Sequence, residues 1–391
     1  MHCVLTAIIL ALGSTVASST AWATPPVDHP AQWRTVDSPR VGVADATAIE
    51  LDDGGLALIG GFTDLLQATA AVQRRDPKAG WEPIGTSLLT PRSAPLVARL
   101  PENGLLVVGG WTGTLPHDVV HLSDAELCDP RRPEQRRALP APFPDRSTPG
   151  LEGATMCTLA DGRILLIHDR DLAIFDPTSL TWSLRSRGGH VRRFAAAIAL
   201  PDGSALIIGG GDEDAPAVES IRIDPAGGVE RKSWESPIDP RLQHPASLRL
   251  NQREVLVAGG EIAGRSVVET WLLDVVDRKV RAVSPLPIVG GLSRGTLVHI
   301  DDRVLLVGGE TVDRRFPSPA SHGAVLRPPW NRPLRLAASP VPAVRTMVVS
   351  RSRGALVIGG YRFDTSVAHT SRVQVHRAIC ELSLPVFAIV D

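Results

Sequence analysis

Apolar residues in this chain recur in short runs of four, and each run ends in a pair of glycines or in a variant of that pair. Seven pairs follow one another along the chain: Gly60-Gly61, Gly109-Gly110, His168-Asp169, Gly209-Gly210, Gly259-Gly260, Gly308-Gly309 and Gly359-Gly360. Their first members lie 49, 59, 41, 50, 49 and 51 residues apart. This nearly constant period predicts repeated structural units, each too small to bury its own apolar faces.

A second apolar segment stands upstream of each run and is separated from it by a turn. In the first four units the turn is Asp53-Gly54, Asn103-Gly104, Asp161-Gly162 and Asp202-Gly203. Such pairs are strong hairpin signals, because type I′ turns need positive φ at both central residues. Each unit therefore begins with a hairpin of two strands, a and b. The a strands are expected at residues 46–51, 95–100, 154–159, 194–200, 246–250, 295–300 and 344–349.

Two further strands, c and d, complete the unit. In three units a third segment runs into Asp-Pro and then a tryptophan, as at Asp76-Pro77 followed by Trp81. Proline cannot donate to a sheet ladder, so Asp-Pro indicates the turn between c and d. Strand b has no polar alternation, which is typical of a strand covered on both faces. Four short strands per unit, stacked face to face around an axis, predict an all-β fold, the β-propeller.

The repeat resembles that of the kelch family of β-propellers. The resemblance rests on the glycine pairs, on Pro91-Arg92 at the opening of a unit, on the Asn103-Gly104 turn and on the c-to-d tryptophans, and it covers residues 32–379. It implies a seven-bladed kelch-type β-propeller with four antiparallel strands per blade. The sequence departs from the family in lacking the usual tyrosine before the tryptophan, in the His168-Asp169 pair of unit 3, and in units 2 and 5, which lack the tryptophan.

Closure of the ring is expected to come from the N-terminal segment. The last repeat supplies strands a, b and c, with c at about residues 371–379, while Gln32–Val36 matches the fourth strand that begins at Trp81. A last blade that takes its outer strand from the N-terminus has no exposed edge. The alternative assigns this strand to residues 384–390.

The first residues have the pattern of a targeting segment. Residues 4–16 form an apolar stretch of signal-peptide length, and Ala21-Trp22-Ala23 offers a small-x-small cleavage site. We therefore expect a signal peptide over residues 1–23 and a single propeller domain over residues 24–391, in a secreted or periplasmic, monomeric protein without a membrane span.

Charge and cysteine content narrow the possible partners. The formal net charge is −1 and the pI about 6.8, so nucleic acid and anionic membranes are not expected partners. After cleavage Cys128, Cys157 and Cys380 remain, and this odd number leaves at least one free thiol, with any disulfide between two of them undetermined.

The loops between strands b and c and between d and a share one face of a propeller, where binding sites are usually built. Arginines of the d-to-a loops include Arg92, Arg192, Arg294 and Arg345, and acids of the b-to-c loops include Asp64, Glu261 and Glu310. Trp111 and Tyr361 directly follow their glycine pairs. The arginines are candidates for binding a carboxylate or sugar acid. Alternatively, they pair with acids of adjacent blades and brace the loops.

Several enzymatic activities of related propellers are disfavoured. Copper-radical oxidases need two tyrosine ligands, and this chain has only Tyr361. Sialidase boxes are absent, and nothing singles out the site of the kelch-fold sialic-acid epimerases, which have six blades. His117 and His121 are the only histidines with i, i+4 spacing, and no third metal ligand is evident. We predict neither metal nor cofactor.

The preferred interpretation is an exported interaction module that binds a protein or a carbohydrate ligand on the face of the b-to-c and d-to-a loops. The alternative is a carbohydrate-acting enzyme, similar to an epimerase or a lyase, with an arginine and an acid in the central pocket. A deep polar pocket with a buried acid of shifted pKa favours the enzyme. A flat rim of exposed aromatic and arginine side chains favours the binding module.

Overall fold

The structure is a computed structural model that describes residues 32–83, 86–101, 104–144, 150–224, 226–313, 316–320, 322–337, 339–351, 354–364 and 372–383. The predicted signal peptide and the alternative closing strand at residues 384–390 lie outside these ranges. The all-β prediction is confirmed, because apart from the 3-10 helix η2 (Pro133–Gln135) the described elements are strands. No helix in these ranges is long and apolar enough to cross a membrane.

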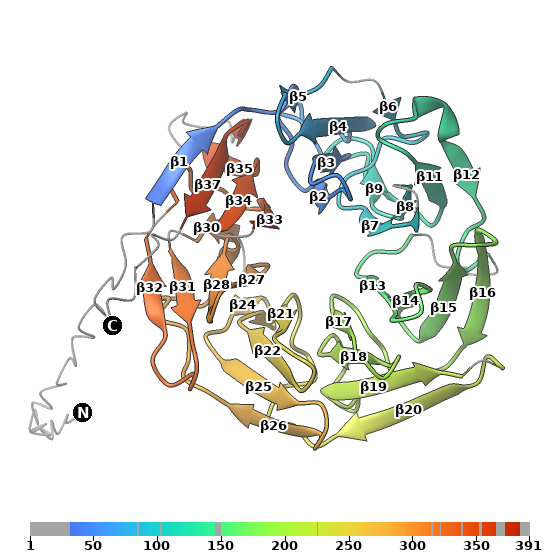
Figure 1. Cartoon of the computed structure of the whole chain (residues 1–391), viewed down its shortest axis with the longest axis vertical. Helices are drawn as coiled ribbons and strands as arrows, with labels where there is room; N and C mark the ends of the chain where they lie inside the picture. The colour runs from blue at the N-terminus through green and yellow to red at the C-terminus, as the bar shows by residue number, and fades with distance from the viewer. Residues whose placement is uncertain are drawn as a thin grey trace, which may run out of the picture.

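Seven antiparallel sheets surround a central axis (Figure 1), which is the arrangement of a β-propeller. We number them as blades 1 to 7 in chain order of their innermost strands. Blade 1 contains β2 (Thr47–Glu50), β3 (Leu56–Ile59), β4 (Ala71–Asp76), β5 (Gly80–Trp81) and β6 (Thr86–Ser87), and blade 2 contains β7 (Leu96–Arg99), β8 (Leu105–Val108), β11 (Ala125–Cys128) and β12 (Arg137–Leu139). Blade 3 contains β13 (Thr155–Thr158), β14 (Ile164–His168), β15 (Asp171–Asp176) and β16 (Thr181–Ser186). Blade 4 contains β17 (Ala196–Ala199), β18 (Ala205–Ile208), β19 (Val218–Ile223) and β20 (Val229–Trp234).

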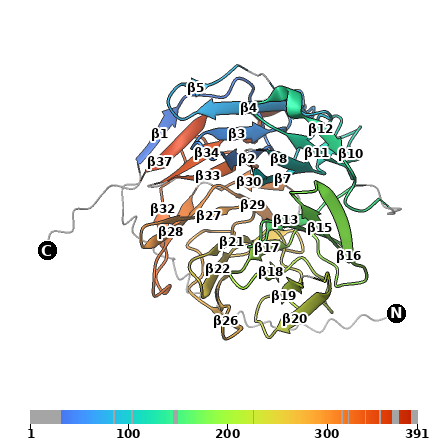
Figure 2. The ribbon, with the colours of Figure 1, turned by 45° about the vertical axis from the view of Figure 1, so that its right-hand side comes forward.

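Blade 5 contains β21 (Ala246–Arg249), β22 (Glu254–Ala258), β25 (Thr270–Asp274) and β26 (Lys279–Ala282). Blade 6 contains β27 (Thr296–Ile300), β28 (Arg303–Val307), β31 (Gly323–Leu326) and β32 (Leu334–Leu336). Blade 7 contains β33 (Met347–Arg351), β34 (Gly354–Ile358), β37 (Ile379–Ser383) and β1 (Gln32–Val36). The oblique view of Figure 2 shows the fourth strands, such as β16 and β20, at the outside of the ring.

Three smaller sheets are built from the b-to-c connections. In blade 2, β9 (Trp111–Thr112) pairs with β10 (Val120–His121), and in blade 7, β35 (Tyr361–Asp364) pairs with β36 (Arg372–Val375). The connections of blades 5 and 6 join in one sheet of β23 (Glu261–Ile262), β24 (Arg265–Ser266), β29 (Glu310–Asp313) and β30 (Phe316–Pro319). These connections lie on the face that the sequence marks for binding.

The core lies between consecutive blades and depends on the second strand of each. Every described residue of β3, β8, β14 and β18 is buried, as the absence of polar alternation predicted. Leu256 of blade 5 and Leu306 of blade 6, for example, belong to one buried cluster. Cys128, Cys157 and Cys380 form no disulfide, and burial raises the pKa of the Cys128 and Cys157 thiols to about 12.

The glycine pairs allow adjacent blades to approach each other at the backbone. Gly209 has a φ of +69°, and a Cβ atom there would lie 2.1 Å from the Leu242 carbonyl oxygen of the next blade. The Gly210 amide donates to that same oxygen over 2.7 Å. In blade 3 the pair is His168-Asp169, where Asp169 adopts a φ of 52° and donates to the Arg192 carbonyl over 3.1 Å.

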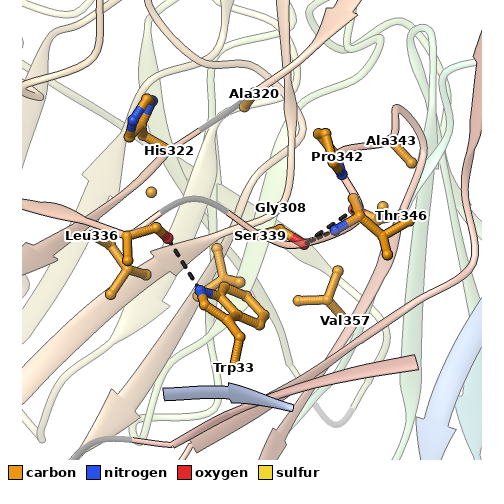
Figure 3. A pocket seen from close by; sticks show the side chains of 14 residues that line it. Trp33, Gly308, Ala320, His322, Leu336, Ser339, Pro342, Ala343, Thr346 and Val357 are labelled. Carbon is orange, nitrogen blue, oxygen red and sulfur yellow. Dashed lines mark hydrogen bonds between the residues drawn. The ribbon is translucent and has the colours of Figure 1, made fainter. Parts of the chain in front are cut away.

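Blade 7 combines the two ends of the described chain. β1 pairs antiparallel with β37 and is the outermost strand of the sheet. Figure 3 shows the Trp33 indole between blades 6 and 7, where its Nε1 donates to the Ala337 carbonyl over 3.2 Å. Beside it lies a cavity of about 20 Å³, which has room for little more than one water molecule.

The expectation for strand c of blade 7 is wrong. The third strand is β37 (Ile379–Ser383), whereas β36 (Arg372–Val375), within the predicted range, pairs with β35 in a separate two-stranded sheet. The sequence repeat does not reveal this difference, because β35 and β36 are inserted between strands b and c and their residues also favour strands.

Candidate functional site

One residue from each blade lies at the axis, just before the innermost strand, and each has a positive φ. We call these seven residues the axial ring: Asp45, Ala94, Gly153, Phe194, His244, Arg294 and Arg345. Their φ values lie between 50° and 77°. All seven line one cavity of about 570 Å³, and its size is within the range of roughly 300–1,000 Å³ that is typical of small-ligand sites.

The backbone of the axial ring is held by hydrogen bonds that pass from blade to blade. The Ala94 amide donates to the Asp45 carbonyl over 2.6 Å, the His244 amide to Phe194 over 2.8 Å, and the Arg294 amide to His244 over 3.2 Å. The Asp45 amide donates to Arg345 over 3.4 Å, across the junction of blades 7 and 1. Because the main chain makes these contacts, the side chains can differ completely from blade to blade.

A second layer of side chains follows the glycine pairs. Each of these residues makes an antiparallel backbone bridge to the residue that precedes the axial-ring residue of the same blade. The bridges are Phe62 to Ala44, Trp111 to Ser93, Glu261 to Gln243, Glu310 to Ser293 and Tyr361 to Val344. Phe62, Trp111 and Tyr361 line the cavity. The Phe62 ring centroid lies 5.9 Å from that of Trp111 and 5.4 Å from that of Tyr361, so Phe62 packs against both rings.

Blades 6 and 7 contribute the charged side of the cavity. Arg294 Nε lies 3.1 Å from Glu310 Oε1, and Arg345 Nε lies 3.3 Å from Glu310 Oε2. The arginine side chains are 25% and 27% exposed, whereas that of Glu310 is only 2% exposed. The guanidinium groups therefore reach the cavity, while Glu310 stays behind them as a shared anchor.

The Glu310 contacts are ionic rather than aligned hydrogen bonds. Both Nε atoms and Glu310 Oε2 are buried without a hydrogen-bond partner among the described residues. Burial raises the pKa of the Glu310 carboxyl, although Arg345 and Arg294 oppose this rise. Burial also disfavours the charge of Arg345, but Asp45 and Glu310 outweigh it and raise the pKa of Arg345. Both arginines remain cationic at any physiological pH.

His244 lies next to this charged group but carries no charge itself. Burial, and then the positive charges of Arg294 and Arg345, lowers the pKa of His244 to about 2. Its ring centroid lies 4.3 Å from that of Phe194, and Arg294 Cζ lies 5.9 Å from the same Phe194 ring. The positive charge of the axial ring is thus confined to Arg294 and Arg345.

Four of the nine residues singled out in the sequence line the cavity, namely Arg294, Arg345, Trp111 and Tyr361. Glu310 lies directly behind the arginines. Glu261 does not line the cavity and accepts a hydrogen bond from Ser293 Oγ over 3.1 Å. Asp64 is exposed on the loop between β3 and β4 and also lies outside the cavity lining.

Arg92 and Arg192 are fully buried and do not reach the cavity. Arg92 contacts Glu126 over 2.6 Å and Asp124 over 3.1 Å. Arg192 donates to the Gly209 and Pro216 carbonyls over 3.0 and 2.9 Å and lies 3.4 Å from Glu219. These two arginines therefore brace the loops, as the alternative held, but they pair with acids of their own blades rather than of adjacent blades.

The difference between the two kinds of arginine is a shift of two residues. Arg92 and Arg192 stand two positions before the axial residues Ala94 and Phe194, where blades 5 and 6 have the buried leucines Leu242 and Leu292. Asp45 and His244 were missed in the sequence. The signal that could have found them is their equivalence, within the repeat, to Arg294 and Arg345.

The wall opposite the arginines comes from blades 2 and 3. Leu115, Val119 and His121 belong to the β9–β10 connection, and Leu151 and Glu152 precede Gly153. His121 Nε2 lies 3.8 Å from Glu152 Oε2. Within the described ranges, no three histidine, cysteine, aspartate or glutamate side chains are grouped so that they could hold a metal ion.

Comparison with known proteins identifies the fold. No protein-family model and no curated protein matches the chain. Among solved structures, the chain is similar to a novel fungal alcohol oxidase of the AA5 family in complex with copper, with 14% identity over 91% of this chain and 76% of that chain and a TM-score of 0.65. It is also similar to YjhT, with 14% identity over 77% of this chain and 99% of that chain and a TM-score of 0.54.

This chain is a β-propeller. At 14% identity the likeness shows the fold alone, so membership of the kelch family stays a prediction. The chain has a single tyrosine, Tyr361.

Proposed function

We propose that this propeller is a binding module whose axial cavity holds a carboxylate-bearing ligand. The observation that supports it is the pair of cationic side chains, Arg294 and Arg345, that line the axial cavity and share one buried anchor, Glu310. A guanidinium presents its N–H groups in a planar fork that matches the two oxygens of a carboxylate. A glycan would supply this group as a sugar acid, and a protein as an acidic side chain or chain end.

The two arginines do not contribute equally. Arg345 Nη1 already lies 3.5 Å from Asp45 Oδ1, so part of its charge is balanced. Among the described residues, Arg294 makes an ion pair only with Glu310, and the printed contact is through its Nε. We therefore assign the direct contact with the ligand to Arg294 and the supporting positive field to Arg345. Asp45 opposes the binding of an anion.

Isothermal titration calorimetry with matched pairs of acids and amides tests this proposal. Glucuronate is compared with glucuronamide, and hexanoate with hexanamide, so that only the charge changes within a pair. At least one acid should bind about ten-fold more tightly than its amide, because a charged hydrogen bond contributes roughly 1.5–3 kcal/mol. Arg294→Gln should abolish the preference. Asp45→Asn should increase the affinity for the acid.

The Asp45 variant provides the control. Asn tolerates the positive φ of this position well, and the change removes only a negative charge next to Arg345. If acids and amides bind alike, or if Asp45→Asn weakens the binding of the acid, the proposal is wrong.

The second candidate is a carbohydrate-acting enzyme that uses the same cavity. It is favoured by His121 and Glu152, a histidine and a carboxylate 3.8 Å apart across the axis from the arginines; Figure 1 shows β13 of blade 3 opposite β27 and β33. Such a pair can accept and return a proton. Proton exchange at the carbon next to the carboxylate of glucuronate in D₂O, followed by NMR and lost in His121→Gln, would support this activity. If no proton exchanges, the enzymatic candidate is rejected and the binding module remains the proposed function.

The N-terminal pattern supports a further element of this proposal, namely that the protein acts outside the cytoplasm. A tagged full-length chain should appear in an exported fraction and lack its first 23 residues by mass spectrometry. Retention of those residues would contradict the signal-peptide prediction.

A further inference from the structure

The axial cavity is chemically divided. Blades 5 to 7 provide His244, Arg294 and Arg345 on one side. Blades 1 to 3 provide an apolar wall on the other, consisting of Phe62, Ala94, Leu96, Trp111, Leu115, Val119 and Leu151. The polar exceptions on that side are His121 and Glu152, which lie near each other, and Asp45, which faces Arg345.

The apolar wall offers few hydrogen bonds to a ligand. The amides of Trp111, Leu115 and Leu151 already donate to Ser93, Leu66 and Leu122 over 2.9, 2.9 and 3.0 Å. Trp111 and Phe62 are only 8% and 3% exposed and pack on each other, so neither presents an open ring face to a pyranose. Sugar hydroxyls placed against this wall would lose water without gaining partners.

The wall is packed against the core, and its residues Leu115 and Val119 lie on the connection between β9 and β10. Phe62 and Trp111 are members of a buried cluster against which Leu115 and Val119 pack, and Leu151 is part of the core between blades 2 and 3. Its shape and polarity are therefore present before any ligand arrives, which lowers the cost of binding an apolar group.

We infer that the ligand is a small amphipathic carboxylate, an inference that rests on the proposed function. Its carboxylate lies at Arg294, and its aliphatic or aromatic body lies against Leu115, Val119 and Leu151. Free aliphatic or aryl acids have this chemistry, and so does the C-terminal residue of a peptide that ends in an apolar side chain.

Titration calorimetry of the full chain with defined probes tests the inference. Hexanoate should bind at least about ten-fold more tightly than glucuronate, because each apolar methylene that leaves water contributes to affinity. N-acetyl-leucine and its amide represent the peptide end. Tighter binding of N-acetyl-leucine than of hexanoate assigns the peptide source and the reverse order assigns the free acid, and both support an amphipathic ligand.

A matched pair of variants locates the apolar body. Val119→Thr replaces a methyl group on the cavity wall by a hydroxyl at nearly constant volume and should weaken hexanoate binding several-fold without weakening that of glucuronate. Val120→Thr is the control, because Val120 is 56% exposed and does not line the cavity. It should leave both affinities unchanged.

The outcomes separate the inference from the proposed function. If glucuronate binds as well as or better than hexanoate, with the same dependence on Arg294, the inference is overturned and the carboxylate site stands. If no acid is preferred over its amide, the proposed function fails, and the inference fails with it. Equal effects of Val119→Thr and Val120→Thr would also overturn the inference.

Discussion

The role of the glycine pairs leads to a sharp prediction on stability. In blade 4, Gly203 and Gly209 have φ values of +84° and +69°, so alanine is strained at both. A Cβ atom at Gly203 would meet nothing within 4 Å, whereas at Gly209 it would lie 2.1 Å from the Leu242 carbonyl oxygen. The two substitutions therefore share the backbone strain and differ in the collision with the next blade.

The magnitudes follow from this comparison. Placing alanine in the left-handed region costs roughly 1–2 kcal/mol, and the gain from restricting the unfolded chain, about 0.4–1 kcal/mol, offsets part of it in both variants. Gly203→Ala should therefore lower the free energy of unfolding by about 0–1.6 kcal/mol. Gly209→Ala must also displace the Leu242 carbonyl that accepts the Gly210 amide, and such overpacking adds roughly 1–3 kcal/mol.

Urea unfolding of the two variants and the parent protein measures the difference, provided that the slopes of the transitions agree. Gly209→Ala should have the lower midpoint by a clear margin. Equal midpoints would refute the view that close approach between blades, rather than backbone conformation alone, requires glycine at this place.

Three further predictions concern closure, bracing and pH. Removing residues 1–37 should lower the melting temperature, because β37 would lose its partner strand β1 and blade 6 would lose the cover of Trp33. If this deletion leaves the melting temperature unchanged and deletion of residues 384–391 lowers it instead, closure by the C-terminal segment is favoured. Arg92→Met should destabilise the protein by about 3–5 kcal/mol because it leaves Glu126 buried without its cation, whereas Arg294→Met should weaken ligand binding more than stability. A larger loss of thermal stability in Arg294→Met than in Arg92→Met would contradict the two assigned roles. Burial disfavours ionisation of Asp53, but hydrogen bonds from the Gly55 amide, Arg74 and Arg131 outweigh it and lower the pKa of Asp53 to about 2. The resulting stabilisation is present above the unperturbed pKa of 3.8 and is lost as the pH falls toward 2, so the melting temperature of Asp53→Asn should fall less steeply with acid than that of the unmodified protein. Parallel curves would be evidence against the ion pairs.

Local patterns in the sequence were sufficient to predict the architecture. The glycine pairs, the Asp-Gly turns and the unbroken apolar b strands are properties of neighbouring residues, so they survive in a reading of the chain alone. They place β3, β8, β14 and β18 correctly as strands covered on both faces. The pairing of Gln32–Val36 with the last blade also follows the match between that segment and the fourth strands.

The residues of the site were only partly predictable, because a loop arginine carries no mark of its direction. Arg92 and Arg345 look alike in sequence, yet two residues of register send one into the core and the other to the axis. The insertion of β35 and β36 in blade 7 was likewise invisible, since its residues form strands as readily as those of strand c.

The axial ring is a product of the tertiary structure. Its members are an acid, two cations, a neutral histidine, a phenylalanine, an alanine and a glycine, which have no side-chain chemistry in common. What unites them is a positive φ and a hydrogen-bonded position at the axis, and both depend on seven blades meeting around one centre. The sequence by itself therefore determined the strands and their repetition, whereas packing of the blades decided which side chains face a ligand, because only closure of the ring brings residues 300 positions apart, Asp45 and Arg345, into contact.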